Sequence, residues 1–272
     1  MKHFITIILI FITSGKSSTQ TIDRKYFVSS TNGFYHSNKN TISHKSGESV
    51  MHKPYKSKSA NKQNIQQPDS LKLSNLMVKL FLEGSYQSHG TMASTIFNLG
   101  MTDDPTATDS IEINLWSQRN LNSNKPDFSQ KVILHNNGIA NATYNVDISK
   151  AKKYFIQIKH RNSVEIWSSL PVDVANNGTY DFSDAQSKAF SDGVNPPPMQ
   201  NMGDDSYALH NGDINQDGTV DGLDMNEVDN NSGLVDIGYF CTDVNGDGVT
   251  DGLDMKIVEL NTGLGLFMSS PF

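Results

Sequence analysis

The sequence predicts a mostly β protein with a small α part, and three observations lead to that prediction. Short segments of alternating apolar and polar residues recur between residues 71 and 190. Two Asp- and Gly-rich segments that match each other begin thirty residues apart near the C-terminus. Charge is also uneven: residues 21–70 carry eight basic and three acidic residues, whereas residues 203–272 carry fourteen acidic residues and one basic residue. The net charge of −7 therefore averages over regions that have separate roles.

The first twenty residues have the layout of a secretory signal peptide, and we predict one over residues 1–20. A short basic start is followed by a nine-residue apolar run at residues 4–12 and then by small polar residues. The run is too short for a membrane helix, which needs about 20 apolar residues. We therefore expect an exported protein, secreted or at the cell surface, with no membrane span.

Residues 21–70 are rich in Ser, Asn, Lys and Gln, and their few aromatic residues show no sustained period. Such a composition buries too little apolar surface to offset the entropy of ordering the chain. We predict a disordered basic spacer here. The alternative is a basic tail that binds anionic glycans.

The alternating segments that follow predict an antiparallel β-sandwich over residues 71–190, of the immunoglobulin-like or prealbumin-like type. Residues 110–116 place Ile111, Ile113 and Leu115 on one face. Six or seven short strands with polar turns in about 110 residues are typical of a sandwich. The other predicted strands are residues 76–82, 131–134, 142–146, 154–160, 164–167 and 179–182. We expect a linker at residues 191–205 and a separate module over residues 206–272.

The predicted sandwich contains few residues that indicate chemistry. Residues 159–162 with Glu165 form the densest polar group, interpreted as a solvated hairpin tip or, alternatively, as a sugar- or anion-binding hairpin with Trp116 or Trp167 as a stacking platform. A single cysteine excludes a disulfide framework and a zinc site of several cysteines. The acidic net charge gives no indication of nucleic-acid binding. No nucleophile elbow or zinc-binding helix motif occurs, so we expect no enzyme.

The two matching segments, residues 213–224 and 243–254, carry oxygen side chains at positions 1, 3, 5, 9 and 12 and Gly at position 6. This is the spacing of an EF-hand calcium loop, in which six to eight hard oxygens surround the ion. We predict two Ca²⁺ ions. The predicted ligands, with Thr219 and Val249 acting through their carbonyls, are Asp213, Asn215, Asp217, Thr219, Asp221 and Asp224, and Asp243, Asn245, Asp247, Val249, Asp251 and Asp254. Eight carboxylates would repel one another without a cation, so this module should fold poorly without calcium.

Each loop is followed by a predicted helix, and neither is preceded by one. Leu253, Ile257, Leu260 and Leu264 recur at helical spacing after the second loop. A duplicated unit of loop and exit helix over residues 210–265 resembles the dockerin family. The whole of residues 75–272 also resembles the sandwich-plus-dockerin-like ends of secreted bacterial surface proteins.

The resemblance implies docking onto a cohesin partner, often within polysaccharide-degrading assemblies, and the ligand roles given above. At positions 10 and 11, where type I dockerins commonly carry a Ser/Thr-type pair, this sequence has Gly222-Leu223 and Gly252-Leu253. The expected partner is therefore a cohesin-like or another surface protein. Thr250 also replaces the apolar residue that loop 1 has at position 8, which we expect to weaken contact between the loops.

These observations predict an exported calcium-binding accessory or anchoring protein that acts in a polysaccharide-degrading or cell-surface assembly. The alternative is a carbohydrate-binding module in which the sandwich binds a glycan. A glycoside hydrolase is a third and weaker interpretation, because no catalytic carboxylate pair is identifiable.

Overall fold

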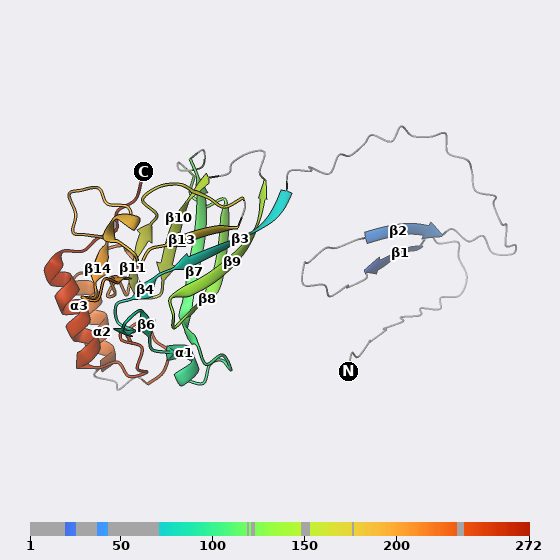
Figure 1. Ribbon diagram of the computed structural model, residues 1–272. Helices are drawn as coiled ribbons and strands as arrows, with labels where there is room; N and C mark the ends of the chain where they lie inside the picture. The colour runs from blue at the N-terminus through green and yellow to red at the C-terminus, as the bar shows by residue number, and fades with distance from the viewer. Residues whose placement is uncertain are drawn as a thin grey trace, which may run out of the picture. The chain divides into compact units, whose positions relative to one another are not determined.

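The computed structural model describes residues 20–25, 37–42, 71–118, 120, 123–147, 153–175, 177–232 and 237–272. The chain divides into two compact units, Met1–Ile65 and Gln66–Phe272. In the first unit, β1 (Gln20–Lys25) and β2 (Ser37–Ile42) form an antiparallel pair (Figure 1). The segment predicted as disordered thus contains one strand pair. The remainder of that segment and residues 1–19 of the predicted signal peptide lie outside the described residues.

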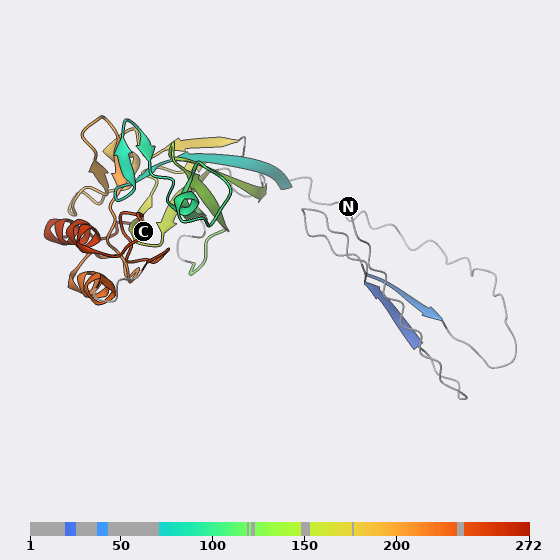
Figure 2. The ribbon, with the colours of Figure 1, turned by 90° about the horizontal axis from the view of Figure 1, so that it is seen from below.

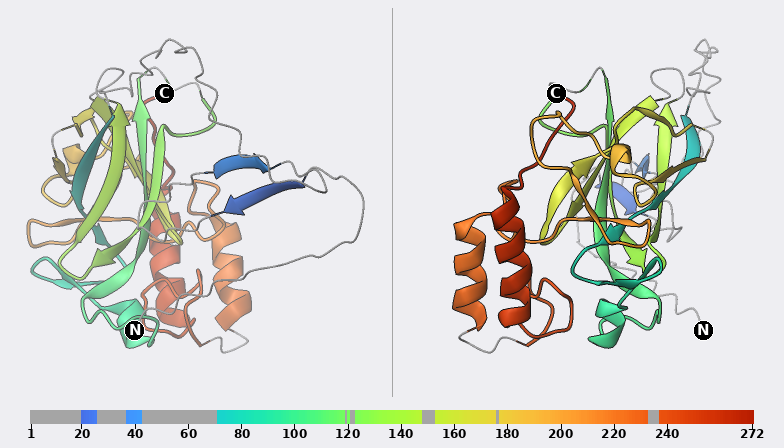
Figure 3. Two further views of the ribbon diagram at one scale, coloured as in Figure 1. Left: turned by 90° about the vertical axis from the view of Figure 1, so that its right-hand side faces the viewer. Right: turned by 60° about the vertical axis from the view of Figure 1, so that its left-hand side comes forward.

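The second unit is mostly β, as predicted, and is built on two main sheets (Figures 1 and 3). One has the strand order β11-β10-β7-β8, with β12 also pairing with β10, and the other has the order β13-β3-β9. The first sheet contains β7 (Ala107–Ser117), β8 (Phe128–His135), β10 (Lys153–His160), β11 (Ser163–Trp167) and β12 (Val172–Asp173). The second contains β3 (Leu71–Lys79), β9 (Ile139–Asp147) and β13 (Gly178–Asp181).

The predicted alternation places the core between the two sheets. Ile111, Ile113 and Leu115 of β7 are fully buried. They belong to one cluster with Leu76 and Val78 of β3. The residues between them on β7 therefore point to the outer face of the sheet, because successive side chains of a strand alternate.

Two strand pairs are parallel, in contrast to the wholly antiparallel sandwich that the sequence predicts. β13 pairs with β3 in parallel, and β15 (Tyr207–Leu209) pairs in parallel with β4 (Phe81–Leu82). Each late strand returns to the sheet after a long excursion, so a tight hairpin does not set its direction. The predicted linker also contains a strand, β14 (Met199–Asn201), which pairs with β15 and buries Met199 in the core.

Short elements complete the β-rich region. β5 (Tyr86–Ser88) and β6 (Thr91–Met92) form a small hairpin, followed by α1 (Thr95–Asn98). The 3₁₀ turn η1 (Gln186–Lys188) precedes β14.

The two C-terminal helices are α2 (Gly222–Ser232) and α3 (Gly252–Leu264), and each begins within the last residues of a predicted loop. They lie side by side at one side of the second unit (Figures 2 and 3). The Asp251 side chain caps α3, and Gly265 ends the helix in the left-handed conformation with φ 66°. None of the helices in the described parts of the chain is long and apolar enough to cross a membrane.

Most of the helical stripe predicted after the second loop faces outward, with Ile257 as the exception, because it packs against the buried cluster of the module. Leu253, Leu260 and Leu264 are between 52% and 60% exposed. Val258 on α3 and Val228 on α2 are instead fully buried, in a small cluster that also contains Val164 of β11. The core of the C-terminal module is thus completed by a sandwich residue.

Candidate metal loops and their interface with the sandwich

The two predicted calcium loops share most of their internal hydrogen bonds, beginning with those of the carboxylate at position 12. Asp224 Oδ1 accepts from the amides of Ile214 and Asn215, at 2.8 and 3.2 Å, and its Oδ2 accepts from Asp221 N at 2.9 Å. In loop 2, Asp254 accepts from the corresponding three amides at 2.7, 2.9 and 2.9 Å. Each of these buried carboxylates therefore ties the start of its loop to the end.

Positions 1 to 6 repeat as well. The amide of Gly218 donates to Asp213 Oδ2 at 3.1 Å, and the amide of Gly248 donates to Asp243 Oδ2 at the same distance. These glycines have φ values of 90° and 91°, a region that side-chain-bearing residues rarely adopt. The Asn side chain at position 3 donates to the Asp at position 5, at 3.0 Å in loop 1 and 2.9 Å in loop 2. The sequence repeat therefore corresponds to a repeat of backbone structure.

Position 8 is buried in both loops, and neither residue there leaves a polar side-chain group without a hydrogen bond. Val220 and Thr250 are both 1% exposed. The Thr250 hydroxyl lies 3.0 Å from that of Thr242, so its burial is matched by a hydrogen bond. Position 7 pairs elsewhere in the chain: Thr219 bridges to Phe267, and Val249 bridges to Ile237.

The first carboxylate of each loop is poorly stabilised as an anion. Burial and the nearby Asp224 carboxylate raise the pKa of Asp213 to about 7. Burial also raises the pKa of Asp243 to about 6, although Arg161 acts in the opposite direction. Asp213 Oδ1 is buried and has no hydrogen-bond partner among the described residues. A cation would satisfy that oxygen, so the hard-oxygen donor set of the loop fits Ca²⁺.

The described residues include no gathered group of three or more His, Cys, Asp or Glu side chains that could hold a metal ion. The position-12 carboxylates are occupied by backbone amides, as described above. Ligation would therefore require local movement of side chains within the loops.

Loop 2 packs closely against the sandwich, which the sequence does not predict. A side chain at Gly84, directly after β4, would collide with the Val244 carbonyl. A side chain at Gly248 would lie 2.6 Å from Leu99, beside α1. The neighbouring Glu83 accepts hydrogen bonds from Asn211 N at 3.1 Å and from Asn261 Nδ2 of α3 at 2.7 Å. Glycine and a half-buried carboxylate thus allow the strand end to contact both loop 2 and α3.

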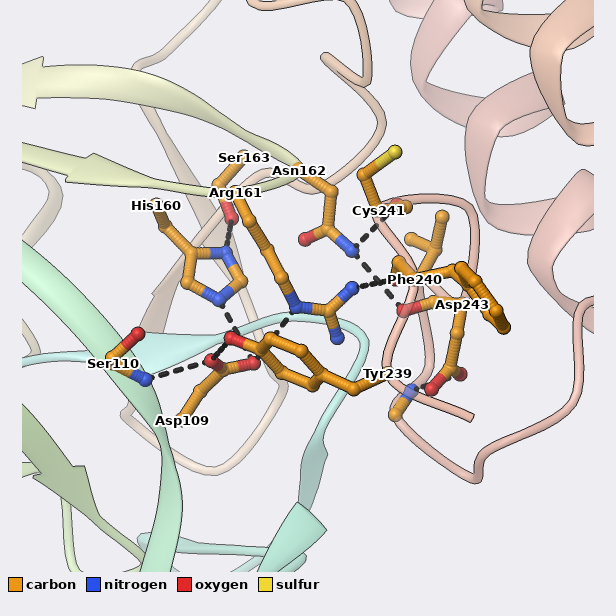
Figure 4. A network of polar contacts seen from close by, with 12 residues as sticks. Asp109, Ser110, His160, Arg161, Asn162, Ser163, Tyr239, Phe240, Cys241 and Asp243 are labelled. Carbon is orange, nitrogen blue, oxygen red and sulfur yellow. Dashed lines mark hydrogen bonds and ion pairs between the residues drawn. The ribbon is translucent and has the colours of Figure 1, made fainter. Parts of the chain in front are cut away.

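A polar network joins the β10–β11 hairpin to the entry of loop 2 (Figure 4). Asp109 Oδ2 lies 3.2 Å from His160 Nε2 and 3.1 Å from Arg161 Nε, and its Oδ1 accepts from the Tyr239 hydroxyl. Arg161 also donates to the Phe240 carbonyl, and its guanidinium stacks 4.4 Å from the centre of the Tyr239 ring. Burial alone would raise the pKa of Asp109, but His160, Arg161 and Tyr239 outweigh it and hold that pKa well below its usual value.

Asn162 extends the same network to the first residue of loop 2. Its Nδ2 donates to the carbonyls of Cys241 and Asp243 at 3.1 and 3.2 Å, and its Oδ1 accepts from Asn211 Nδ2 at 2.8 Å. The hairpin tip predicted to be solvated is therefore buried: Asn162 is 0% exposed and His160 is 4% exposed. Its partner Asp109 lies 52 residues from Arg161 in the chain, and no spacing pattern indicates such a pairing.

The order Ser163–His160–Asp109 has the residue types of a hydrolase triad, with Ser163 Oγ 2.8 Å from His160 Nδ1. All three residues are buried, with Ser163 and Asp109 each 1% exposed. Tyr239 and Arg161 also contact the Asp109 carboxylate. The trio lies within the interface and contributes hydrogen bonds to it.

The two tryptophans do not form an open stacking platform. Trp116 and Trp167 are 8% and 3% exposed and pack with Phe155. Phe272 covers them, with ring centres 5.8 Å from Trp116 and 4.8 Å from Trp167.

Among curated proteins, none matches the sequence of this chain. Residues 211–260 match the family model described as the dockerin type I domain. The match contains both loops, α2 and most of α3, and it follows the β-rich region. The C-terminal part of this chain is therefore similar to the type I dockerin domain; dockerin domains are non-catalytic docking modules that bind calcium and cohesins.

Proposed function

We propose that this chain is an exported, non-enzymatic accessory or anchoring protein that docks onto a surface protein within a polysaccharide-degrading or cell-surface assembly. The observation that carries the proposal is the hydrogen-bond pattern that the two loops share around Asp224 and Asp254. Proteins with dockerin modules are typically extracellular or at the cell surface, which supports the proposed location.

Each loop would hold one Ca²⁺ ion. The proposed side-chain ligands are Asp213, Asn215, Asp217, Asp221 and Asp224, and Asp243, Asn245, Asp247, Asp251 and Asp254, with the carbonyls of Thr219 and Val249. The ion would supply positive charge to buried carboxylates whose pKa values are raised without it. The amides of Gly218 and Gly248 already hold the first carboxylate of each loop in place.

The outward faces of α2 and α3 are the proposed docking surface. Leu223 and Leu253, at position 11 of their loops, are both 59% exposed. Leu260 and Leu264 extend the apolar surface along α3. Loop 2 is held by the sandwich at Gly84 and Asn162, which supports assigning the partner to the helices. An apolar contact at position 11 would select a partner that is cohesin-like but apolar at the corresponding site.

Calcium titration of the full chain by calorimetry tests the metal part of the proposal. We expect two sites in the unaltered protein and one in each of Asp213→Ala and Asp243→Ala, because each variant removes the first ligand of one loop. Asp229→Asn, an exposed position on α2, is the matched control and should keep both sites. Unchanged stoichiometry in both loop variants would contradict the ligand assignment.

Binding to an immobilised cohesin domain that is apolar at the site facing position 11, with calcium present, tests the docking part. We expect Leu223→Glu and Leu253→Glu together to lower affinity by about tenfold or more, because a buried charge replaces an apolar contact. Leu170→Glu, at a 71% exposed position on the sandwich, controls for added charge. If the variant with both Leu223→Glu and Leu253→Glu binds as tightly as the unaltered protein, these helix faces are not the docking surface.

A further inference from the structure

A groove lies on the outer face of the first sheet, beside loop 1. Its volume is about 580 Å³, within the range of small-molecule sites. Strands β7, β10 and β11 form its floor, loop 1 contributes Asp213 and Gln216, and Phe272 lies at its edge. A smaller cavity of about 220 Å³ shares Glu112, Lys159 and Gln216 with it. The groove therefore continues along the sheet and could accept an extended ligand.

A row of polar side chains crosses the floor of the groove. Glu112 Oε1 accepts from Asn114 Nδ2 at 2.9 Å, and Asn114 Nδ2 also donates to Gln157 Oε1 at 3.2 Å. Gln157 Oε1 accepts from Trp116 Nε1 at 2.9 Å, and Gln157 Nε2 donates to Glu165 at 2.9 Å. These bonds fix the side chains before any ligand arrives, which lowers the entropy lost on binding.

One atom of this row is left without a partner. Asn114 is 3% exposed, and its Oδ1 is buried with no hydrogen bond among the described residues. Asn114 also lines the groove. A buried acceptor left unpaired lowers stability, and a hydroxyl donor from a ligand would satisfy it.

The carboxylates of the floor already have donors from the protein. Glu165 accepts from Lys159 Nζ at 2.9 Å, from Gln157 and from Trp167 Nε1 at 3.0 Å. Glu112 Oε1 accepts from Ser129 in addition to Asn114. A basic peptide would need carboxylates that are not yet paired. Asp213 and Asp217 of loop 1 also line the groove, but as proposed calcium ligands they would face the ion, so this arrangement favours a neutral ligand with several hydroxyls.

The edge of the groove is aromatic. Phe272 is 49% exposed and rests on both tryptophans. A sugar ring has hydroxyls at its rim and apolar C–H groups on its faces, so it can meet the polar floor and the aromatic edge together. We propose that this groove binds a neutral saccharide chain, through Asn114 and Gln157 on the floor and Phe272 at the edge.

The proposal goes beyond docking and does not depend on it, since the groove lies on the sandwich and the docking surface on the helices. Titration with neutral hexasaccharides of β-1,4-linked glucose, xylose and mannose tests it, on the full chain with calcium present. Trp116 and Trp167 are the two tryptophans of the chain, and both line the groove, so their emission should change on binding. We expect at least one hexasaccharide to bind with a Kd of about 1 mM or lower.

Asn114→Ala and Phe272→Ala should each weaken binding by about two- to tenfold, the effect of losing one hydrogen bond or one aromatic contact. Phe97→Ala, at a 38% exposed position on α1 outside the groove, should leave affinity unchanged. Phe272→Ala is a surface change and keeps the test valid if Asn114→Ala does not fold. No binding to any of the three saccharides, or binding of a hexalysine peptide in their place, would overturn the proposal. The calcium stoichiometry, measured on the same samples, reports separately on the loops.

Discussion

At the scale of single residues, the carboxylates of Asp213 and Asp243 have raised pKa values, chiefly because of burial. The folded-state pKa of Asp213 is about 7, whereas an aspartate in an unfolded chain titrates near 3.9. The folded state thus binds this proton more tightly than the unfolded state does. Its contribution to stability is fully present below about pH 4 and is lost as the pH rises through about 7.

We therefore expect Asp213 and Asp243 to make the protein more stable at pH 5 than at pH 8 when EDTA has removed calcium. Asp213→Asn should reduce this pH dependence and stabilise the calcium-free protein at pH 8 by about 1–3 kcal/mol. The same variant should bind calcium more weakly. Thermal unfolding followed by circular dichroism in EDTA measures both effects. Asp229→Asn, which is exposed, should behave like the unaltered protein. An identical pH profile in Asp213→Asn would show that Asp213 is not the titrating group.

Tyr239 is the second residue whose contribution to stability a single substitution can measure. Its hydroxyl donates to the buried Asp109 carboxylate, which raises the tyrosine pKa to about 12, chiefly through burial and the Asp109 charge. Tyr239→Phe should lower the free energy of unfolding by about 1.5–3 kcal/mol, the range for hydrogen bonds to charged groups. Tyr207→Phe is the matched control, because its hydroxyl makes no hydrogen bond among the described residues. Equal denaturation midpoints for the two variants would mean that the interface does not depend on this contact.

At the scale of elements, Gly84 and Gly263 differ in the space that is available for an added side chain. Gly84→Ala, between β4 and the β5–β6 hairpin, would push against the Val244 carbonyl at position 2 of loop 2. We expect a loss of about 1–3 kcal/mol and weaker calcium binding at loop 2 alone. Urea unfolding would detect the loss of stability, and calcium calorimetry would detect the weaker binding. An unchanged calcium affinity of loop 2 would argue against coupling between loop 2 and the end of β4.

Gly263, inside α3, provides the opposite case. No atom would lie within 4 Å of an added Cβ at this position. Gly263→Ala should therefore raise the free energy of unfolding by about 0.5–1 kcal/mol through helix propensity. A decrease in the urea midpoint would indicate that the last turn of α3 contacts something that the structure does not place there.

At the scale of the whole molecule, the C-terminal segment connects loop 1 to the sandwich. The Val220 amide donates to the Leu266 carbonyl at 2.9 Å, and the Met268 amide donates to the Gly218 carbonyl at 2.7 Å. The same segment then places Phe272 on both tryptophans. Val164 of the sandwich also lies in the core of the helical module. Calcium bound to loop 1 should therefore stabilise the sandwich as well.

We expect the second unit to unfold in a single transition with the same midpoint by tryptophan fluorescence and by far-ultraviolet circular dichroism. Calcium at about one hundred times its Kd should add about 2.7 kcal/mol for each site. Phe272→Ala should leave the calcium stoichiometry unchanged but reduce the calcium-dependent shift of the tryptophan signal. If the midpoint measured by tryptophan fluorescence does not change with calcium, loop 1 and the sandwich are energetically independent.

The sequence by itself determined the features that depend on local spacing. The two Asp- and Gly-rich loops, the strands around Ile113 and Ile158 and the start of α3 all follow from residues close together in the chain, because turn chemistry, alternation and helix capping are local. The family match over residues 211–260 agrees with that part of the prediction.

Only the tertiary structure decided how these parts meet. Asp109, Arg161 and Tyr239 lie on three separate segments and form one network around the buried Asp109 carboxylate (Figure 4). Asn114 of β7 and Asp213 of loop 1 line one groove in the same way. No spacing predicts such sets, because their partners are chosen by packing across the chain. A polar hairpin tip therefore looks solvated in the sequence, although in the fold it becomes the centre of an interface.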